Sequence, residues 1–118
     1  MAGERVLIVD DHAGFRACAR ELLDSEGFDV VGEAGDAASA IAAAGDLDPD
    51  VILLDIQLPD VDGVQAAKRF ECRNESPAIV LISSRDASYV AGALAESPAC
   101  GFIPKSELTG AALRKLMR

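Results

Sequence analysis

Residues 53–63 read Leu53-Leu54-Asp55-Ile56-Gln57-Leu58-Pro59-Asp60-Val61-Asp62-Gly63. This stretch continues an apolar run from Val51, places one carboxylate at its end, and then turns through Pro, Asp and Gly. A continuous apolar run that stops at such a turn is typical of a buried strand, so Asp55 is predicted at a strand's carboxyl end. A second apolar run, residues 6–9, is followed in the same way by Asp10 and Asp11. Neighbouring strands of an open α/β sheet would bring these acids into one crevice.

The alternation of strand-like and helix-like segments predicts a single α/β domain over all 118 residues. Strands are expected at about residues 4–10, 28–34, 50–55, 78–83 and 100–103. Helices are expected at about residues 12–26, 36–46, 63–73, 87–96 and 107–117. The first, third and fourth strands are continuously apolar, as in a sheet covered on both faces, whereas the second is half polar and the fifth is short. We therefore predict a doubly wound, flavodoxin-like parallel sheet of five strands in the order 2-1-3-4-5.

Local sequence patterns predict where three helices begin or end. Gly27 is expected to end the first helix, Asp36 to cap the second and Ser106 to cap the fifth. The first helix is expected to bury a stripe at helical spacing, formed by Phe15, Cys18, Ala19, Leu22 and Leu23. The second is expected to bury Ala37, Ala40, Ile41 and Ala44, and the fifth Leu108, Ala112, Leu113 and Leu116.

Composition restricts the classes of function. The formal charge of −9 disfavours nucleic-acid binding by this domain alone, because phosphate contacts need clustered Lys and Arg. Cys18, Cys72 and Cys100 are odd in number and form no CxxC pair, so we interpret them as small buried apolar residues in a reducing cytosol. The apolar runs are too short for a signal peptide or a membrane span, and a cytoplasmic, membrane-independent protein is expected.

Five motifs occur in order along this chain. They are Asp10-Asp11 after the first strand, Asp55 after the third, the pattern Asp55-x-x-x-Pro59-x-x-Asp62-Gly63, Ser83 after the fourth and Lys105 after the fifth. Taken singly, the acid pair could cap the next helix, and the others could be ordinary turn, strand-end or surface residues. Together, over the whole chain, they resemble the receiver domains of two-component response regulators. Lys105 is not followed by proline, and the order Pro104-Lys105-Ser106 is similar to receivers linked to helix-turn-helix output domains.

The resemblance implies a role for each site residue. Asp55 would take a phosphoryl group from a sensor histidine kinase or a phosphotransfer protein, becoming an acyl phosphate. Mg²⁺ would be the cofactor, held by Asp10, Asp11, Asp55 and the backbone carbonyl of Gln57. Lys105 would pair with Asp55 and then with a phosphoryl oxygen, and the Ser83 hydroxyl would donate to the phosphoryl group. Such a protein is a signalling phosphoacceptor that catalyses only its own phosphorylation and dephosphorylation.

The resemblance also implies a conformational switch. Ser83 would move toward the phosphoryl group, and the Phe102 ring would fill the space that it leaves. The surface of the fourth helix, fifth strand and fifth helix would change and could support a phosphorylation-dependent homodimer. Its mixture of charges also fits a plain solvated rim; the residues concerned are Arg85, Asp86, Glu96, Lys105, Arg114 and Lys115.

Other classes remain open. A haloacid-dehalogenase-type hydrolase also uses a strand-end aspartate, but it expects a second acid two residues later, where this chain has Gln57. A flavin module is disfavoured because the crevice is acidic. His12, the single histidine, is interpreted as a surface or cap residue rather than a phosphorelay histidine. An output domain is not expected within these residues, so the chain either acts alone or is the front part of a DNA-binding regulator that controls transcription.

Overall fold

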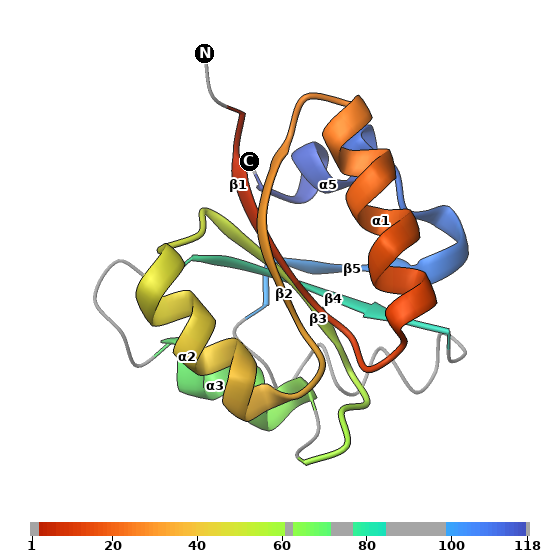
Figure 1. Cartoon of the computed structure of the whole chain (residues 1–118). Coiled ribbons are helices and arrows are strands. Elements are labelled where there is room, and N and C mark those ends of the chain that lie inside the picture. Colours follow the sequence, from red (N-terminus) through yellow and green to blue (C-terminus); the bar gives the residue numbers. More distant parts are fainter. Residues whose placement is uncertain (1–2, 61–62, 72–76, 85–98, 118) are drawn as a thin grey trace.

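The computed structural model of the chain describes residues 3–60, 63–71, 77–84 and 99–117 (Figure 1). Its strands are β1 (Arg5–Val9), β2 (Asp29–Ala34), β3 (Val51–Asp55), β4 (Ala78–Ser83) and β5 (Gly101–Pro104). Its helices are α1 (Ala13–Ser25), α2 (Ala37–Leu47), α3 (Gly63–Glu71), the short 3₁₀ helix η1 (Lys105–Glu107) and α5 (Gly110–Met117). The helix predicted at about residues 87–96 lies outside the described residues.

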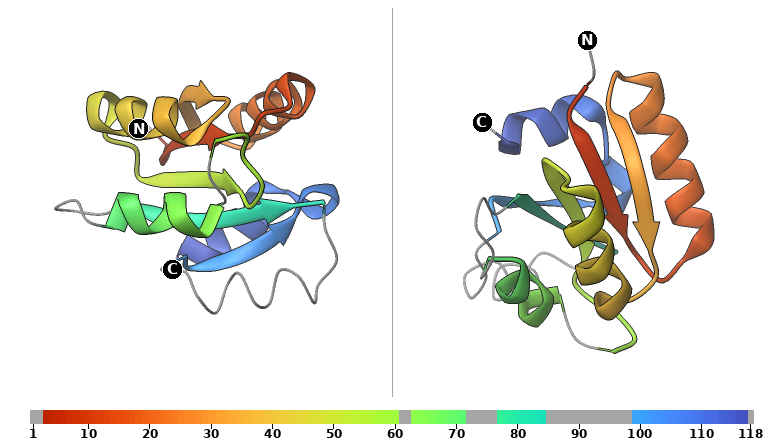
Figure 2. Two further views of the ribbon diagram at one scale, coloured as in Figure 1. Left: turned by 90° about the horizontal axis from the view of Figure 1, so that it is seen from below. Right: turned by 60° about the vertical axis from the view of Figure 1, so that its left-hand side comes forward.

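The strands form one sheet in the order β2-β1-β3-β4-β5, and every neighbouring pair is parallel. Figure 2 shows β1 and β2 running side by side in the same direction. The predicted fold class and strand order are therefore confirmed. Val9 pairs with Leu54, and Asp55 pairs with Ile82, so three neighbouring strands end at the same edge of the sheet.

Both faces of the sheet are covered, and the strand residues alternate between them. On one face, Leu7 and Val9 of β1 pack in a cluster with buried residues of α2 and α3. On the other face, Val6 and Ile8 pack in a second cluster with buried residues of α1 and α5. Figure 1 shows the two pairs of helices on opposite sides of the strands. Two-sided burial explains why the central strands are continuously apolar.

The predicted ends of α1 and α2 are confirmed. Gly27 adopts φ 93°, a left-handed conformation suited to glycine, directly after the α1 end residue Glu26. The Asp36 carboxylate accepts a hydrogen bond of 2.7 Å from the Ser39 backbone N–H and so caps α2.

The predicted start of the last helix is wrong. Ser106 lies in η1 rather than at a cap, and α5 begins only at Gly110. Between them Leu108 adopts an extended conformation and buries its side chain in the core. The hydroxyl oxygen of Thr109 then accepts a hydrogen bond of 3.0 Å from the Ala112 N–H. Burial of Leu108 thus interrupts the helical path, and Thr109 supplies the cap.

The interpretation of the cysteines as buried residues is wrong for the two that are described. Cys18 and Cys100 are exposed, and Cys72 lies outside the described residues. Helix α1 buries Ala19 and Leu23, and Cys18 lies about 100° around the helix from Ala19, because each residue turns an α-helix by that angle. Both thiols are free, so the correction concerns their burial and not the absence of a pairing between them.

Among the described residues, no helix has the length and apolarity that crossing a membrane would require.

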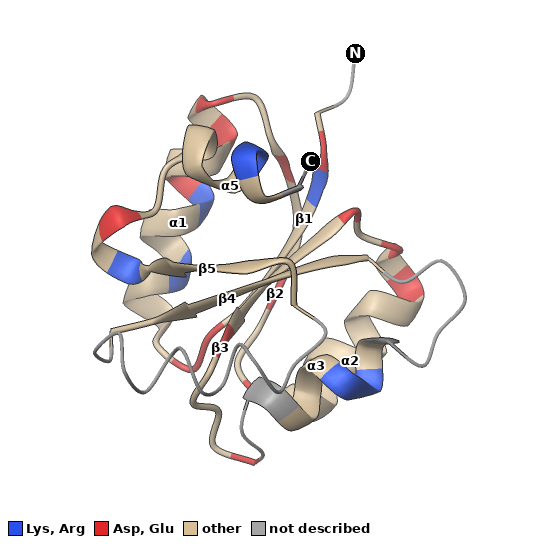
Figure 3. Ribbon diagram, turned by 180° about the vertical axis from the view of Figure 1, so that it is seen from behind, with Lys and Arg blue, Asp and Glu red and all other residues tan. Residues whose placement is uncertain are grey.

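The described basic residues lie on several elements, and Figure 3 shows Lys and Arg on α1, α3 and α5. Since α3 and α5 cover opposite faces of the sheet, these charges are divided between two sides of the molecule.

Candidate functional site

The ends of β1 and β3 bring three carboxylates together. Asp10 directly follows β1 and Asp55 is the last residue of β3; both are buried, with residue exposures of 0% and 4%. Asp11 lies beside them and is exposed. One ligand atom from each of Asp10, Asp11, His12 and Asp55 can be chosen so that all four atoms lie within 4.8 Å of one another. The acids singled out in the sequence therefore share one crevice at the edge of the sheet.

Lys105 reaches into this cluster from the end of β5. Its Nζ lies 2.5 Å from Asp10 Oδ2 and 3.2 Å from Asp55 Oδ2. The ammonium group also lies 4.8 Å from the centre of the Phe15 ring, within the range of a cation–π interaction. The sequence predicted the contact with Asp55, and the structure adds a closer one with Asp10. A single ammonium group thus lies between two buried carboxylates.

These contacts shift the pKa values of two groups. Burial is the main cause that raises the pKa of Asp55, and the negative charge of Asp10 adds to it; the Gln57 N–H and Lys105 act in the opposite direction. For Lys105, burial lowers the pKa, but the hydrogen bond to Asp10 and the charges of Asp55 and Asp10 outweigh it and raise the pKa. The cluster therefore holds negative charge that one lysine does not fully compensate.

The loop after β1 is held by several polar contacts. The His12 backbone N–H donates to Asp10 Oδ1 at 2.8 Å, so Asp10 orders the start of α1 while it faces the site. The His12 ring is 71% exposed, as predicted, but its Nδ1 also lies 3.0 Å from Asp11 Oδ1 and 3.1 Å from Asp10 Oδ1. Arg16 Nη1 donates to the backbone carbonyl of Asp10 at 2.5 Å. Helix α1 has no side-chain cap at His12, so Asp10 contacts the residue before the helix without capping it.

The loop after β3 is fixed just beyond Asp55. The Ile56 N–H donates to the Ile82 carbonyl at 3.1 Å, and the Ile56 side chain is buried. The Gln57 N–H donates to Asp55 Oδ1 at 3.0 Å, while the Gln57 side chain is exposed. With Lys105 on Oδ2, both oxygens of Asp55 have a donor. The orientation of the carboxylate is thus defined by its own loop and by β5.

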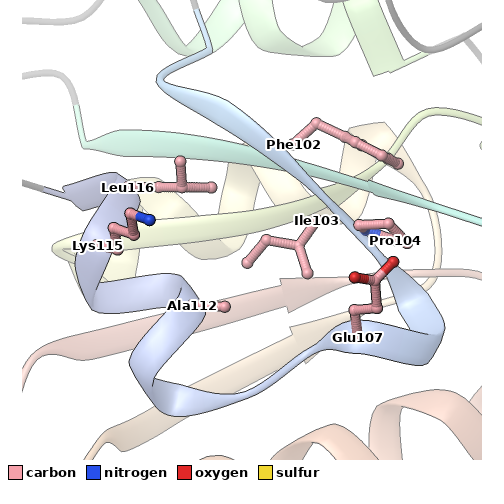
Figure 4. Close-up of a pocket in the computed structure, with 7 residues that line it drawn as sticks. All are labelled: Phe102, Ile103, Pro104, Glu107, Ala112, Lys115 and Leu116. Carbon is pink, nitrogen blue, oxygen red and sulfur yellow. The ribbon is translucent and has the colours of Figure 1, made fainter. Parts of the chain in front are cut away.

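The other two predicted residues lie at the ends of β4 and in β5. Ser83 is buried at 2% exposure and pairs in register with Pro104, next to Lys105. Phe102 is half-buried and packs against the cluster on the α2 and α3 face. Figure 4 shows its ring on the opposite side of β5 from Ile103, which points toward α5. Ser83 is therefore near the site edge, and Phe102 lies two positions before Pro104, the β5 partner of Ser83.

A shallow pocket of about 270 Å³ lies between β5 and α5 (Figure 4). Its lining consists of Phe102, Ile103, Pro104, Glu107, Ala112, Lys115 and Leu116. One lining residue, Pro104, directly precedes Lys105 in the sequence, but none of the four cluster residues lines the pocket.

The crevice fits a small, hard divalent cation such as Mg²⁺. Its donors are mainly carboxylate oxygens, the ligands that this ion prefers. Two of these carboxylates, Asp10 and Asp55, are buried side by side, and the Lys105 ammonium group contacts both. The negative charge of Asp10 is one of the causes that raise the pKa of Asp55. A cation at this place would relieve the repulsion that the carboxylates exert on each other.

Sequence reasoning missed two residues of the site. Phe15 was assigned to the core stripe of the first helix, yet its ring also faces the Lys105 ammonium group. His12 was predicted as a surface or cap residue, and it is exposed at the N-cap position of α1, but the closeness of its ring to two carboxylates was not predicted. The available signal for Phe15 was an aromatic residue in the first turn of the helix that follows Asp10-Asp11.

Comparisons with known sequences agree with this geometry. The sequence model of the response regulator receiver domain matches residues 6–117. The nitrate/nitrite response regulator protein NarP of Escherichia coli is 39% identical over 102 residues, which cover 86% of this chain and 47% of NarP. The transcriptional regulatory protein PdtaR of Mycobacterium tuberculosis is 32% identical over 121 residues, covering 95% of this chain and 59% of PdtaR. The chain thus spans roughly half the length of these curated relatives.

Solved structures give the same result. The signal receiver domain of NarL from Mycobacterium tuberculosis has a TM-score of 0.83 and 35% identity, with 98% of both chains covered. The response regulator domain of CheB from Thermotoga maritima has a TM-score of 0.80 and 28% identity, with 97% of this chain and 93% of the CheB domain covered.

Proposed function

The chain belongs to the response regulator receiver domain family, and on this basis we propose that Asp55 accepts a phosphoryl group from a sensor histidine kinase or a phosphotransfer protein. A receiver is the signalling domain of a two-component system. The observation that supports Asp55 as the acceptor is its position: a buried carboxylate at the end of β3, oriented by Gln57 and Lys105 within a cluster of acids.

In the proposed step, a carboxylate oxygen of Asp55 forms a bond to phosphorus while the phosphorus–nitrogen bond of a phosphohistidine breaks. The electron pair of that bond stays on the imidazole nitrogen of the donor. Asp10, Asp11, Asp55 and the Gln57 carbonyl would hold Mg²⁺, which supplies positive charge for the phosphoryl oxygens when bound. Lys105 would exchange its contact with Asp55 for one with a phosphoryl oxygen. Positioning and charge neutralisation are most of what this reaction requires, so the domain catalyses only its own phosphorylation and dephosphorylation.

The phosphorylated state would be transmitted through Ser83 and Phe102. Ser83 would donate its hydroxyl to the phosphoryl group, and the Phe102 ring would move into the space that becomes free. Phe102 lines the pocket between β5 and α5, and Ser83 pairs with Pro104, another lining residue, which supports this surface as the one that changes. The fourth helix of the predicted surface, with Arg85, Asp86 and Glu96, lies outside the described residues. Homodimerisation through this surface is part of the proposal.

The relatives support a role in transcription. NarP is named a response regulator and PdtaR a transcriptional regulatory protein, and both are longer than this chain. The domain would therefore control transcription in the cytoplasm through an output domain outside residues 1–118. It would not itself contact nucleic acid or a membrane.

Intact-mass spectrometry after treatment with acetyl phosphate tests the proposal. We expect one added phosphoryl group per chain, only in the presence of Mg²⁺, and none in Asp55→Asn. Labelling that survives in Asp55→Asn would contradict Asp55 as the acceptor. Repeated turnover of small phosphoesters would instead favour the hydrolase alternative.

A further inference from the structure

Asp60 joins the loop after β3 to the beginning of α2. Its Oδ1 accepts a hydrogen bond of 2.9 Å from the Ala37 N–H, and its Oδ2 accepts one of 3.0 Å from the Ala38 N–H. Asp60 is 23 positions from Ala37 and 22 positions from Ala38 in the sequence. Figure 1 shows the loop after β3 at the same end of the molecule as the start of α2.

The beginning of α2 therefore has two acidic caps. Asp36 is its own N-cap and accepts from the Ser39 N–H, whereas Asp60 reaches it from another element. The first N–H groups of a helix lack partners within the helix and favour negative charge, so this end of α2 is a strong anchor for a carboxylate. The two oxygens of Asp60 accept from two neighbouring backbone N–H groups, so both the orientation of the carboxylate and its distance from α2 are fixed.

This anchor holds the loop that orients Asp55. At its beginning, the loop is fixed by the bonds from Ile56 to β4 and from the Gln57 N–H to Asp55. At the other end of the same five-residue segment it is fixed by Asp60, with Pro59 restricting the backbone between them. Gln57 follows the Ile56 attachment and precedes the Asp60 attachment, so a shift of its backbone would strain its own bond to Asp55 or the bonds of Asp60 to α2.

We infer that Asp60 is a positioning residue for the metal site, which acts by holding the Gln57 backbone where its carbonyl can bind Mg²⁺. The inference rests on the proposed function, because it concerns the same site. Groups that orient metal ligands without touching the metal commonly change metal affinity by about tenfold or more when they are removed. Through Asp60, helix α2 takes part in the site although none of its described residues lies in the acidic cluster.

The test compares Asp60→Ala with Asp36→Ala. Both substitutions remove an acidic cap from the same end of α2, but only Asp60 belongs to the loop after Asp55. We would measure the dissociation constant of Mg²⁺ alone by calorimetry, the Mg²⁺ dependence of phosphorylation by acetyl phosphate, and the melting temperature of each variant.

We expect Asp60→Ala to raise the dissociation constant and the half-saturating Mg²⁺ concentration about tenfold, with the phosphorylation rate at saturating Mg²⁺ unchanged. Asp36→Ala should change both Mg²⁺ constants less than about twofold while lowering the melting temperature to a similar extent. An equal effect of the two variants on Mg²⁺ affinity, or no effect of Asp60→Ala, would overturn the inference. A wild-type chain that neither binds Mg²⁺ nor becomes phosphorylated would instead overturn the proposed function.

Discussion

Asp55 is subject to opposing influences. Burial and the charge of Asp10 favour its protonated form, whereas the Gln57 N–H and Lys105 favour its ionised form, and the net effect raises its pKa. Because the ionised form of Asp55 is disfavoured in the folded chain, its ionisation lowers the free energy of unfolding in the absence of a cation. Such a cost is common at functional sites, where charges are arranged for a ligand rather than for the fold.

Removing the charge of Asp55 should therefore change how stability depends on pH. A raised carboxyl pKa means that the folded chain binds its proton more tightly than the unfolded chain does. Stability should fall as the pH rises from the ordinary value of 3.8 through the raised pKa. In Asp55→Asn this part of the pH dependence should disappear, and without Mg²⁺ at neutral pH the variant should be at least as stable as the wild type.

Urea denaturation in EDTA at several pH values between acid and neutral measures this effect. Asp46→Asn, which changes an exposed carboxyl outside the cluster, is the matched control. A profile for Asp55→Asn that parallels the wild type would contradict the assignment of this pH dependence to Asp55.

Lys105 should stabilise the fold mainly below its pKa. Because its pKa is raised, Lys105 contributes its full stabilisation at pH values below the ordinary pKa of 10.5. This stabilisation should be lost as the pH rises through the raised pKa. Lys105→Met keeps most of the unbranched side chain but leaves Asp10 and Asp55 without their cation. We expect a loss of about 2 kcal/mol in the free energy of unfolding at neutral pH and a weaker alkaline decline.

Chemical denaturation from neutral to alkaline pH tests the role of Lys105. Lys115→Met, at an exposed position of α5, should remain near the wild type. If both variants lose the same stability, the contacts of Lys105 with the two acids contribute nothing specific.

At the scale of the elements, α5 shows how tertiary packing can move a helix start. Ser106 has the right residue type for a cap, but it lies in η1, and burial of Leu108 delays the helix until Gly110. Further contacts fix α5 to the end of α1: Arg114 donates to the Glu26 carbonyl at 2.7 Å and lies 4.3 Å from the centre of the Phe28 ring. The position of α5 is thus determined by several contacts with distant residues.

The cap of α5 can be tested directly. Thr109→Ala removes the oxygen that accepts from the Ala112 N–H and should lower the free energy of unfolding by about 1 kcal/mol. Ser106→Ala should change it by less than about 0.5 kcal/mol, because the residue is exposed and provides no side-chain cap to η1 or α5. Thermal or urea denaturation of both variants measures the difference, and a larger loss in Ser106→Ala would contradict the observed cap.

At the scale of the whole molecule, the parallel sheet is what creates the site. Each central strand ends at the same edge, so acids that are 45 positions apart, Asp10 and Asp55, become neighbours. Lys105 comes to the same edge because β5 is parallel to β4. A cation held by the acids at this edge would link the ends of β1 and β3 and should therefore stabilise the folded state.

Mg²⁺ should accordingly raise the melting temperature of the wild-type chain, and EDTA should reverse the effect. Binding to the folded state alone gives about 2.7 kcal/mol when the free ion is at 100 times its dissociation constant. Differential scanning calorimetry over a Mg²⁺ series measures this, with NaCl at equal ionic strength as the control. A melting temperature that does not respond to Mg²⁺, or that responds equally in Asp55→Asn, would contradict a metal site formed with Asp55.

Much of the fold could be predicted because its signals are local. Apolar runs, the Asp36 cap and the turn at Gly27 depend on adjacent residues, and the strand order follows from which runs are continuously apolar. The same local patterns predicted that Asp10, Asp11 and Asp55 would meet, since they follow neighbouring strands, whereas the contact of Lys105 with Asp55 was implied by the family resemblance. The exposure of Cys18 was not predictable in this way, because it depends on how far the buried stripe of α1 extends around the helix.

The amino-acid sequence alone was sufficient for the strand ends and for the gathering of three acids at one edge, because both follow from periodicity and residue type, whereas the roles proposed for these residues came from the family resemblance. The tertiary structure alone established that Lys105 contacts Asp10 more closely than Asp55, that Thr109 caps α5, and that Asp60 binds the start of α2. The Lys105 and Asp60 contacts join residues far apart in the chain, and the Thr109 cap follows from burial of Leu108. All three depend on how the helices pack on the sheet, which short-range patterns do not encode.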